Sequence, residues 1–300
     1  MKLTFHGAVR TVTGSQHLLQ ANGKQVLLDC GLYQGRRAEA NRRNSVFTYD
    51  PKKIDTVVLS HGHMDHAGNL PTLVKRGFTG NIFCTPATRD LCSVMLLDSA
   101  HIQLKDAEFL NKRRKEGEPP IEPLYALPDV QKTLKQMIAV PYLRPMVVTH
   151  GVTATFRDAG HILGSASVTL DAEENGRKQR IGFTGDVGRR EFPLLRDPDP
   201  MEDLDVLISE STYGDRLHRS DVEAEDALAD IVRRVYRRGG VIVMPAFAVG
   251  RTQTVVYHLH QLFLAAKLPR IPIFVDSPLA THVTAVFRLH PDCYDEETLA

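Results

Sequence analysis

Short apolar runs separated by turn residues dominate the first part of the chain, a pattern typical of β-strands. The Asn22-Gly23 pair stands between two such runs and predicts a type I′ hairpin, because both residues tolerate a positive φ. Helical spacing predicts helices at Asn69–Arg76 and Ala87–Arg114. The predicted strands are Leu3–Phe5, His17–Gln20, Gln25–Asp29, Ile54–Ser60, Ile82–Cys84, Met146–Phe156, Ser165–Leu170 and Arg180–Thr184.

The pattern changes near residue 205, where single strands begin to alternate with helices. Such alternation indicates βαβ units and a parallel sheet. We therefore expect an α/β protein with a first domain at residues 1–205 and a second at 206–300. The strands expected from this point onward are Leu204–Ser209, which spans the boundary, Val241–Pro245 and Ile271–Val275, and the helices are Val222–Arg237, Thr252–Leu264 and Leu279–Leu289.

The composition is that of a globular protein, since 42% of the 300 residues are hydrophobic and 24% are charged. A formal net charge of +1 gives no overall basic field, so binding of nucleic acid would need a local patch. The amino terminus lacks the apolar segment of a signal peptide, and no stretch approaches the ~20 apolar residues of a membrane span. We expect a cytoplasmic protein with no membrane segment.

The four cysteines, Cys30, Cys84, Cys92 and Cys293, are scattered and form no CxxC pair. This usage favours reduced thiols and argues against zinc held by cysteines.

Basic residues cluster at several places along the chain. The tract Lys112–Lys115 is interpreted as a solvated helix end rather than an RNA contact. Paired arginines, which are usually solvated, occur at 36–37, 42–43, 233–234 and 237–238. Of these, Arg36 and Arg37 lie closest in sequence to a candidate site residue.

The stretch LSHGHMDHAGNLP carries the strongest chemical signal, with His61, His63, Asp65 and His66 directly after a predicted strand. Imidazole and carboxylate are zinc ligands, and Gly62 lets the backbone curl so that the side chains converge. Asp65 and His66 can face a second point, and two metals ~3.5–4 Å apart are suited to hydrolytic displacement. The alternative is a polar loop in which one histidine caps a helix.

Three other residues have the character of site residues. His161 lies between small residues in DAGHILGSASVTL, and Asp186 ends a strand in IGFTGDVG, where its two oxygens could bridge two metals. The alternatives are a capped turn for His161 and an Asx turn for Asp186. Asp29, in VLLDCG, is expected to orient the site by accepting hydrogen bonds rather than to bind metal.

Together these pieces resemble the metallo-β-lactamase superfamily over about the first two hundred residues. The resemblance implies an αββα sandwich with two zinc ions at the sheet edges. It assigns His61, His63 and His161 to one zinc and Asp65 and His66 to the other, with Asp186 as the bridge.

The later stretches ISESTYGDRLH and GGVIVMPAFAVGRTQTVVYHLHQLF resemble the opening of the β-CASP domain, found in a family of RNA-processing nucleases. The resemblance gives Glu210 a catalytic role, with its carboxylate orienting a proton donor; the alternative is a capping or surface glutamate. In PAFAVGRTQ, Arg251 and the start of a helix could face a phosphate, as could Ser277 in VDSPLA. Both stretches also fit ordinary strand-to-helix turns.

The chain departs from the β-CASP family in one respect. Two further family histidines have no match after Glu210, and the end at DEETLA falls within a helical pattern. We therefore expect the front part of a longer protein, with an incomplete second domain and with weak metal binding and cleavage by this part alone.

These observations predict a zinc-dependent ribonuclease that hydrolyses phosphodiester bonds of single-stranded RNA with a di-zinc-activated water, and Asp65 and Glu210 as its catalytic residues. A homodimer is compatible with this interpretation. The alternatives are a thioesterase or lactamase acting on a small molecule, and a non-catalytic RNA-binding scaffold.

Overall fold

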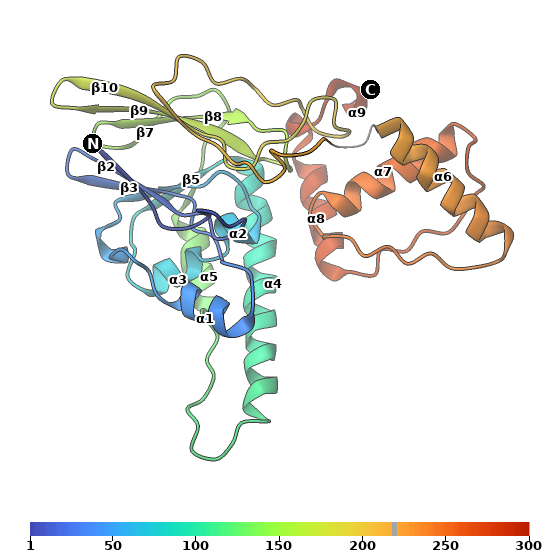
Figure 1. Ribbon diagram of the computed structural model, residues 1–300, viewed down its shortest axis with the longest axis horizontal. Helices are drawn as coiled ribbons and strands as arrows, with labels where there is room; N and C mark the ends of the chain where they lie inside the picture. Colours follow the sequence, from blue (N-terminus) through green and yellow to red (C-terminus); the bar gives the residue numbers. More distant parts are fainter. Residues whose placement is uncertain (218–220, 300) are drawn as a thin grey trace.

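Two β-sheets stack face to face in the first part of the chain (Figure 1). The computed structural model describes residues 1–217 and 221–299; His218 and Ala300, which end two of the stretches quoted above, lie outside the described residues. The stacked sheets and the helices beside them confirm the expected α/β class.

The first sheet has six strands in sequence order. The first three strands pair antiparallel, and the third strand also begins a parallel set that continues through the fourth, fifth and sixth. Asn22 and Gly23 have φ angles of 51° and 70°, which confirms the predicted hairpin. Its strands are β1 (Lys2–Phe5), β2 (His17–Ala21), β3 (Lys24–Leu28), β4 (Thr56–Val58), β5 (Asn81–Cys84) and β6 (Met137–Ala139).

The second sheet has the order β11-β10-β9-β8-β7 and is antiparallel except for the β10–β11 pair. Although the sequence placed Val206–Ile208 beyond the domain boundary, this strand pairs with β10 and extends the sheet. The strands are β7 (Met146–Thr149), β8 (Val152–Asp158), β9 (Ala166–Glu174), β10 (Arg177–Phe183) and β11 (Val206–Ile208).

Helices cover the outer face of the first sheet (Figure 1). The helices expected at Asn69–Arg76 and Ala87–Arg114 are confirmed as α3 (Leu70–Lys75) and α4 (Pro86–Asn111). Apolar side chains of α3, α4 and α5 form one core with the first sheet, and a second core fills the space between the sheets. The other elements in this layer are α1 (Arg37–Ser45), a 3-10 turn (Pro51–Lys53), α2 (Met64–Ala67) and α5 (Leu127–Gln136).

The second part of the chain is helical in the structure, and two strand predictions there are wrong. Val241–Pro245 and Ile271–Val275 carry a strand composition, but among the described residues neither has a hydrogen-bonded neighbour, and Val243 and Phe274 are 86% and 85% exposed. A strand exists only where a ladder partner is present. The helices are α6 (Asp221–Arg237), α7 (Arg251–Leu264), α8 (Pro278–Leu289) and α9 (Glu296–Leu299), with a 3-10 turn at Pro291–Cys293.

The two parts meet where α8 packs against α4. Val283 and Phe287 of α8 share an apolar cluster with Leu91 of α4 and Ile162. His290, at the end of α8, lies 2.8 Å from the Asp90 carboxylate of α4.

All four cysteines are buried and free. Across the described ranges, no helix combines the length and the apolar character of a membrane span.

Candidate metal centre

The candidate ligands lie where strands of both sheets end. Asp29 follows β3, His61 follows β4 and Asp186 follows β10, whereas His161 precedes β9. Because neighbouring strands end together at one edge of a sheet, these side chains converge although they are far apart in sequence.

Close backbone packing holds the ligand segment. His63 precedes α2, whose first turn carries Asp65 and His66. The N–H of Ser15 donates to the Asp65 carbonyl at 2.8 Å, and a Cβ at Gly31 would lie only 1.6 Å from the same oxygen. Glycine is therefore needed at position 31 for the β3 end to approach α2 this closely.

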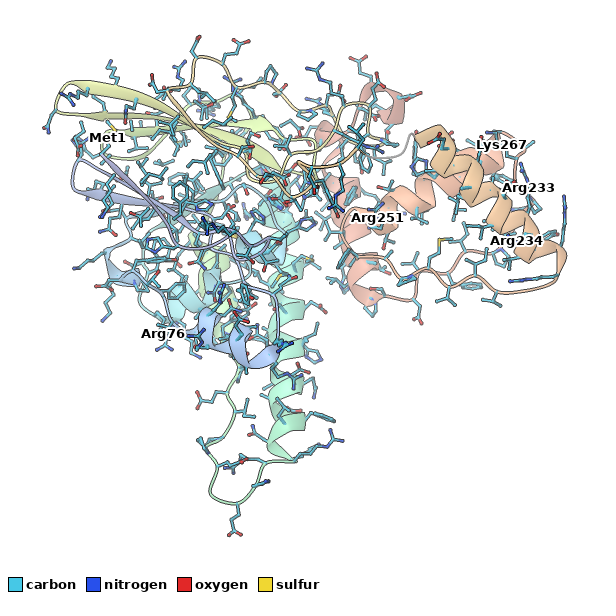
Figure 2. All side chains as sticks on the ribbon, viewed as in Figure 1. Met1, Arg76, Arg233, Arg234, Arg251 and Lys267 are labelled. Carbon is cyan, nitrogen blue, oxygen red and sulfur yellow. The ribbon has the colours of Figure 1, made fainter. Side chains whose placement is uncertain are left out.

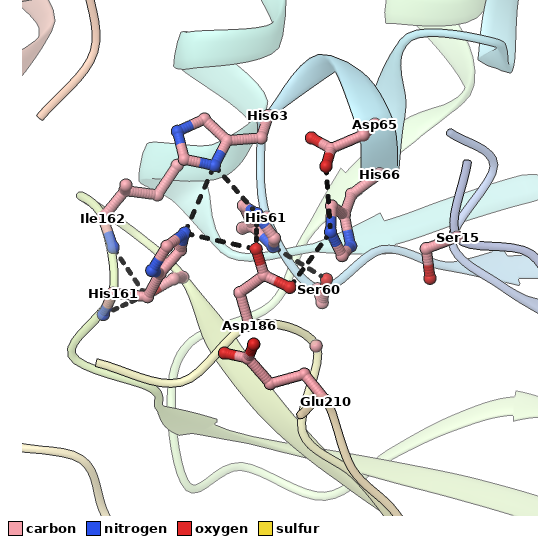
Figure 3. A network of polar contacts seen from close by, with 12 residues as sticks. Ser15, Ser60, His61, His63, Asp65, His66, His161, Ile162, Asp186 and Glu210 are labelled. Carbon is pink, nitrogen blue, oxygen red and sulfur yellow. Dashed lines mark hydrogen bonds and ion pairs between the residues drawn. The ribbon is translucent and has the colours of Figure 1, made fainter. Parts of the chain in front are cut away.

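Three imidazole nitrogens and one carboxylate oxygen meet at a single point (Figure 3). Nδ1 of His63 lies 3.2 Å from Nε2 of His61 and 3.2 Å from Nε2 of His161. Oδ2 of Asp186 is 3.8 Å from the His61 nitrogen and 3.5 Å from the His161 nitrogen. All four candidate ligand atoms lie within 4.8 Å of one another.

The other oxygen of Asp186 faces a second, looser group. Oδ1 of Asp186 lies 3.2 Å from Nε2 of His66, and Oδ2 of Asp65 lies 3.9 Å from the same nitrogen. Asp186 thus stands between the two groups, in the arrangement expected of a bridging carboxylate.

The first group fits a zinc ion. Two atoms bound at about 2.0–2.1 Å to one tetrahedral ion lie roughly 3.3 Å apart, close to the spacing of these nitrogens. Burial and the neighbouring imidazoles lower the pKa of His61 far below its usual value and that of His63 to about 3. Burial also lowers the pKa of His161. The three rings are therefore neutral near pH 7, as metal ligands must be.

In His66 and Asp186, neighbouring charges and hydrogen bonds outweigh the effect of burial on the pKa. Burial alone would lower the pKa of His66, but Asp29 and Asp186 raise it well above its usual value. Burial alone would raise the pKa of Asp186, but the hydrogen bond and charge of His66 hold it below its usual value. In Asp65, burial is the largest effect and raises the carboxyl pKa.

Asp29 lies behind the ligands and is fully buried. Its carboxylate accepts hydrogen bonds from the N–H and Oγ of Ser60, at 2.8 and 2.9 Å, and contacts Nδ1 of His66 at 2.7 Å. A φ of 58° turns Asp29 away from the strand direction. The contact between Asp29 and Nδ1 of His66 directs Nε2 of His66 toward Asp186. This is the orienting role expected of Asp29 from the sequence.

Glu210 follows β11 and lies beside the loop that carries Asp186 (Figure 3). Its Oε1 accepts a hydrogen bond from the N–H of Val187 at 2.8 Å, and its Oε2 accepts one from the N–H of Thr212 at 3.4 Å. Its charge also acts on His161, whose pKa it raises in part. Glu210 therefore supports the loop that carries Asp186.

The two residues expected to contact phosphate occupy helix starts. Arg251 begins α7 and is exposed between the two parts of the chain (Figure 2). Gly250, directly before it, lies against Ile162, the neighbour of His161. The Ser277 hydroxyl caps α8 by accepting a hydrogen bond from the N–H of Ala280 at 3.1 Å.

Two serines that the sequence analysis did not consider hold the ligands in place. Ser60 links Asp29 to Nδ1 of His61, which its hydroxyl contacts at 3.0 Å. The Oγ of Ser165 accepts hydrogen bonds from the N–H groups of His161 and Ile162. The available signals were a serine directly before His61 and another four residues after His161, but serine is too common in turns for such signals to be specific.

Sequence comparisons with known proteins assign the chain to a family. The sequence model of the metallo-beta-lactamase superfamily matches residues 9–229, and that of the Beta-Casp domain matches residues 252–300.

Three curated relatives illustrate the similarity. Ribonuclease TTHA0252 of Thermus thermophilus is 35% identical over 300 residues, covering 100% of this chain and 64% of its own length. The transcription termination factor FttA of Methanosarcina mazei is 32% identical, covering 97% of this chain and 44% of its own. An RNase J-like protein of Methanocaldococcus jannaschii is 30% identical, covering 95% and 60%.

The chain therefore spans between 44% and 64% of the length of these three relatives. Since the superfamily model covers most of it and the relatives match nearly all of it, the chain belongs to the metallo-β-lactamase superfamily and to its β-CASP branch.

Proposed function

We propose that this protein is a zinc-dependent ribonuclease that hydrolyses phosphodiester bonds of single-stranded RNA in the cytoplasm. The observation that carries the proposal is the position of Asp186, whose two oxygens face two separate groups of metal-ligating side chains. The names of the relatives, a ribonuclease, a transcription termination factor and an RNase J-like protein, support RNA as the substrate.

His61, His63 and His161 would hold one zinc ion and Asp65 and His66 the other, with Asp186 shared. When bound, two zinc ions supply Lewis acidity toward water and toward a phosphoryl oxygen. The protein contributes the geometry, because Asp29 and Ser60 keep His66 and His61 in the orientations that point their Nε2 atoms inward.

Asp65 would position the attacking water. Its carboxylate belongs to the looser group, and its side chain is 19% exposed, so it can accept a hydrogen bond from water beside the substrate. Glu210 holds the loop that carries Asp186 by accepting a hydrogen bond from it. The negative charge of Glu210 would orient the group that donates a proton to the departing oxygen.

The start of α7 would bind a phosphate of the substrate. Gly250 places this helix end next to the His161 segment, where the positive end of the helix dipole and the Arg251 guanidinium favour an anion. A small-molecule lactamase or thioesterase does not require this second, helical part.

The test is cleavage of a labelled single-stranded RNA by the whole purified protein, because weak metal binding and cleavage are expected of this part alone. We expect cleavage that stops with a chelator and returns when zinc is added, with an elemental analysis that shows bound zinc. The His61→Ala variant should contain less zinc and should not cleave.

Two results would favour the other interpretations. RNA binding without cleavage at full zinc content would indicate a scaffold. Hydrolysis of a thioester or a β-lactam without activity on RNA would indicate a small-molecule hydrolase.

A further inference from the structure

Helix α1 lacks the apolar residues by which a helix normally packs against a protein core. Its sequence, RAEANRRNS, has no apolar face, and only Asn44 is buried. Helices in proteins normally gain stability by burying an apolar stripe. Here Asn44 anchors the helix by bonding to the backbone N–H and carbonyl of Tyr33, at 2.8 and 2.9 Å.

The exposed surface of α1 is strongly basic. Arg43 pairs with Glu39 at 3.1 Å and stacks on the ring of Tyr33, and Arg37 pairs with Asp106 of α4 at 3.5 Å. Arg36 and Arg42 have no ion-pair partner within the described parts of the chain. In a protein of net charge +1, this helix is a local concentration of positive charge.

A short series of backbone hydrogen bonds joins α1 to the candidate metal centre. The N–H of Leu32 donates to the carbonyl of Met64 at 2.9 Å, and the N–H of Gly31 donates to the carbonyl of Ser15 at 3.0 Å. Ser15 in turn bonds to the carbonyl of Asp65. The position of α1 relative to Asp65 is therefore fixed by the same backbone that holds the ligands.

Exposed apolar side chains accompany the arginines. Val9, Val12 and Val46 are 54%, 63% and 66% exposed. The loop that carries Val9 and Val12 is joined to Gln34, just before α1, by a hydrogen bond from the Gln34 N–H to the Thr13 hydroxyl. A positively charged surface that tracks the phosphates is a general feature of proteins that bind single-stranded RNA, and these valines add exposed apolar surface to it.

We propose that α1 and the loop 8–13 bind the substrate RNA outside the metal centre, with Arg36 and Arg42 contacting its phosphates. This inference rests on the proposed ribonuclease function and adds a substrate path on the first domain. Single-stranded RNA is favoured over an acidic protein because its phosphates match the unpaired Arg36 and Arg42, and because it is the substrate proposed for the metal centre of the same domain.

The test compares two double variants with the same loss of charge. Arg36→Gln with Arg42→Gln removes the two unpaired arginines, and Arg114→Gln with Lys115→Gln is the matched control, on the exposed loop beyond α4. Both are prepared in an Asp65→Asn background to prevent cleavage. The probe is a fluorescent oligouridylate of about 20 nucleotides, titrated at several salt concentrations.

For the α1 variant we expect about 10-fold weaker binding and a salt slope shallower by about 1.4, since each phosphate contact on a single strand contributes about 0.7. The control should match the parent. With Asp65 restored, the α1 variant should slow cleavage of the 20-nucleotide RNA more than cleavage of a tetranucleotide.

Equal affinity of the α1 variant and the control would overturn the inference while leaving the ribonuclease function intact. An equal loss of binding to a polyglutamate peptide would show that the surface accepts any polyanion, and would also overturn it. If the parent neither binds nor cleaves RNA, the proposed function itself fails.

Discussion

Asp186 is the residue on which the candidate metal centre depends most, because its two carboxylate oxygens face different groups of ligands. The candidate ligands could be selected from sequence because HGHMDH is a dense and specific pattern, and because His161 and Asp186 adjoin predicted strands. The roles of Ser60 and Ser165 could not be predicted, since they depend on backbone positions that only the folded chain brings together.

The Asp65→Asn variant tests the proposed catalytic carboxylate. Asparagine keeps the shape of the side chain but removes the charge, so we expect cleavage of RNA to slow by at least ~10² while the free energy of unfolding stays near the wild-type value. Single-turnover rates and denaturant unfolding measure the two quantities. The Asp230→Asn variant, changed at an exposed position, is the control. A wild-type rate for Asp65→Asn would exclude Asp65 from the chemistry.

The Glu210→Gln variant separates two roles of Glu210: its hydrogen bond with the loop that carries Asp186, and its negative charge. The amide oxygen of glutamine can still accept the hydrogen bond from the N–H of Val187, so zinc content should be unchanged. Cleavage should slow by about 10-fold or more, because the charge that acts on the proton donor is lost. Zinc stoichiometry and single-turnover kinetics are the measurements. Loss of zinc would mean that the Glu210 charge is needed to hold Asp186, contrary to its proposed role.

Asp158 should make stability depend on pH. Burial raises the pKa of this carboxyl to about 7, whereas an exposed aspartate ionises near 4. Between about pH 4 and pH 7 the folded state holds a proton that the unfolded state releases, so stability falls as pH rises through this window.

The Asp158→Asn variant, which resembles the protonated side chain, should lack this decrease. The quantity to compare is the free energy of unfolding of the variant minus that of the wild type. This difference should be about 1–3 kcal/mol larger at pH 8 than at pH 4. Urea unfolding across the pH range measures the difference. Parallel curves for the two proteins would show that Asp158 ionises normally in the folded state.

At the level of elements, most strands of the first part, together with α3 and α4, could be predicted because each buries a clear apolar pattern. The elements α5 and β6 were not predicted, and the single strand expected at Met146–Phe156 is the pair β7 and β8, separated by a turn at His150 and Gly151. Helix α1 was not predicted because it has no apolar face to detect. The strands expected at Val241–Pro245 and Ile271–Val275 show the reverse case: their composition favours β-structure, but a strand also needs a partner, which sequence composition does not report.

Gly31 tests how the end of β3 supports α2. A Cβ at this position would lie 1.6 Å from the carbonyl oxygen of Asp65 and 2.7 Å from the backbone nitrogen of His66. The Gly31→Ala variant must therefore shift α2, and we expect about 2 kcal/mol or more of lost stability together with a lower zinc content.

Gly214→Ala is the matched control for this variant, because a Cβ there would come no closer than 3.3 Å to another residue. Zinc stoichiometry and thermal unfolding compare the two. If Gly31→Ala retained full zinc and wild-type stability, the close contact between these segments would not be what positions the ligands.

At the scale of the whole molecule, every candidate ligand belongs to the first part of the chain, whereas Arg251 belongs to the second. The contact between α8 and α4 keeps the two parts together, and it includes Phe287, which is 5% exposed, and the ion pair of His290 with Asp90. Metal binding and substrate binding should therefore respond differently when this contact is weakened.

The Phe287→Ala variant removes a buried ring from the contact between α8 and α4, which should cost about 3 kcal/mol of its stability. We expect zinc content to stay at the wild-type level, while RNA affinity and the cleavage rate fall because the start of α7 no longer stays beside His161. The Leu289→Ala variant is the matched control on the same helix, since Leu289 is 70% exposed. Elemental analysis, binding titrations and limited proteolysis of the two variants provide the comparison. Loss of zinc in Phe287→Ala alone would mean that the second part also holds the ligands in place, and the division of roles between the two parts would have to be abandoned.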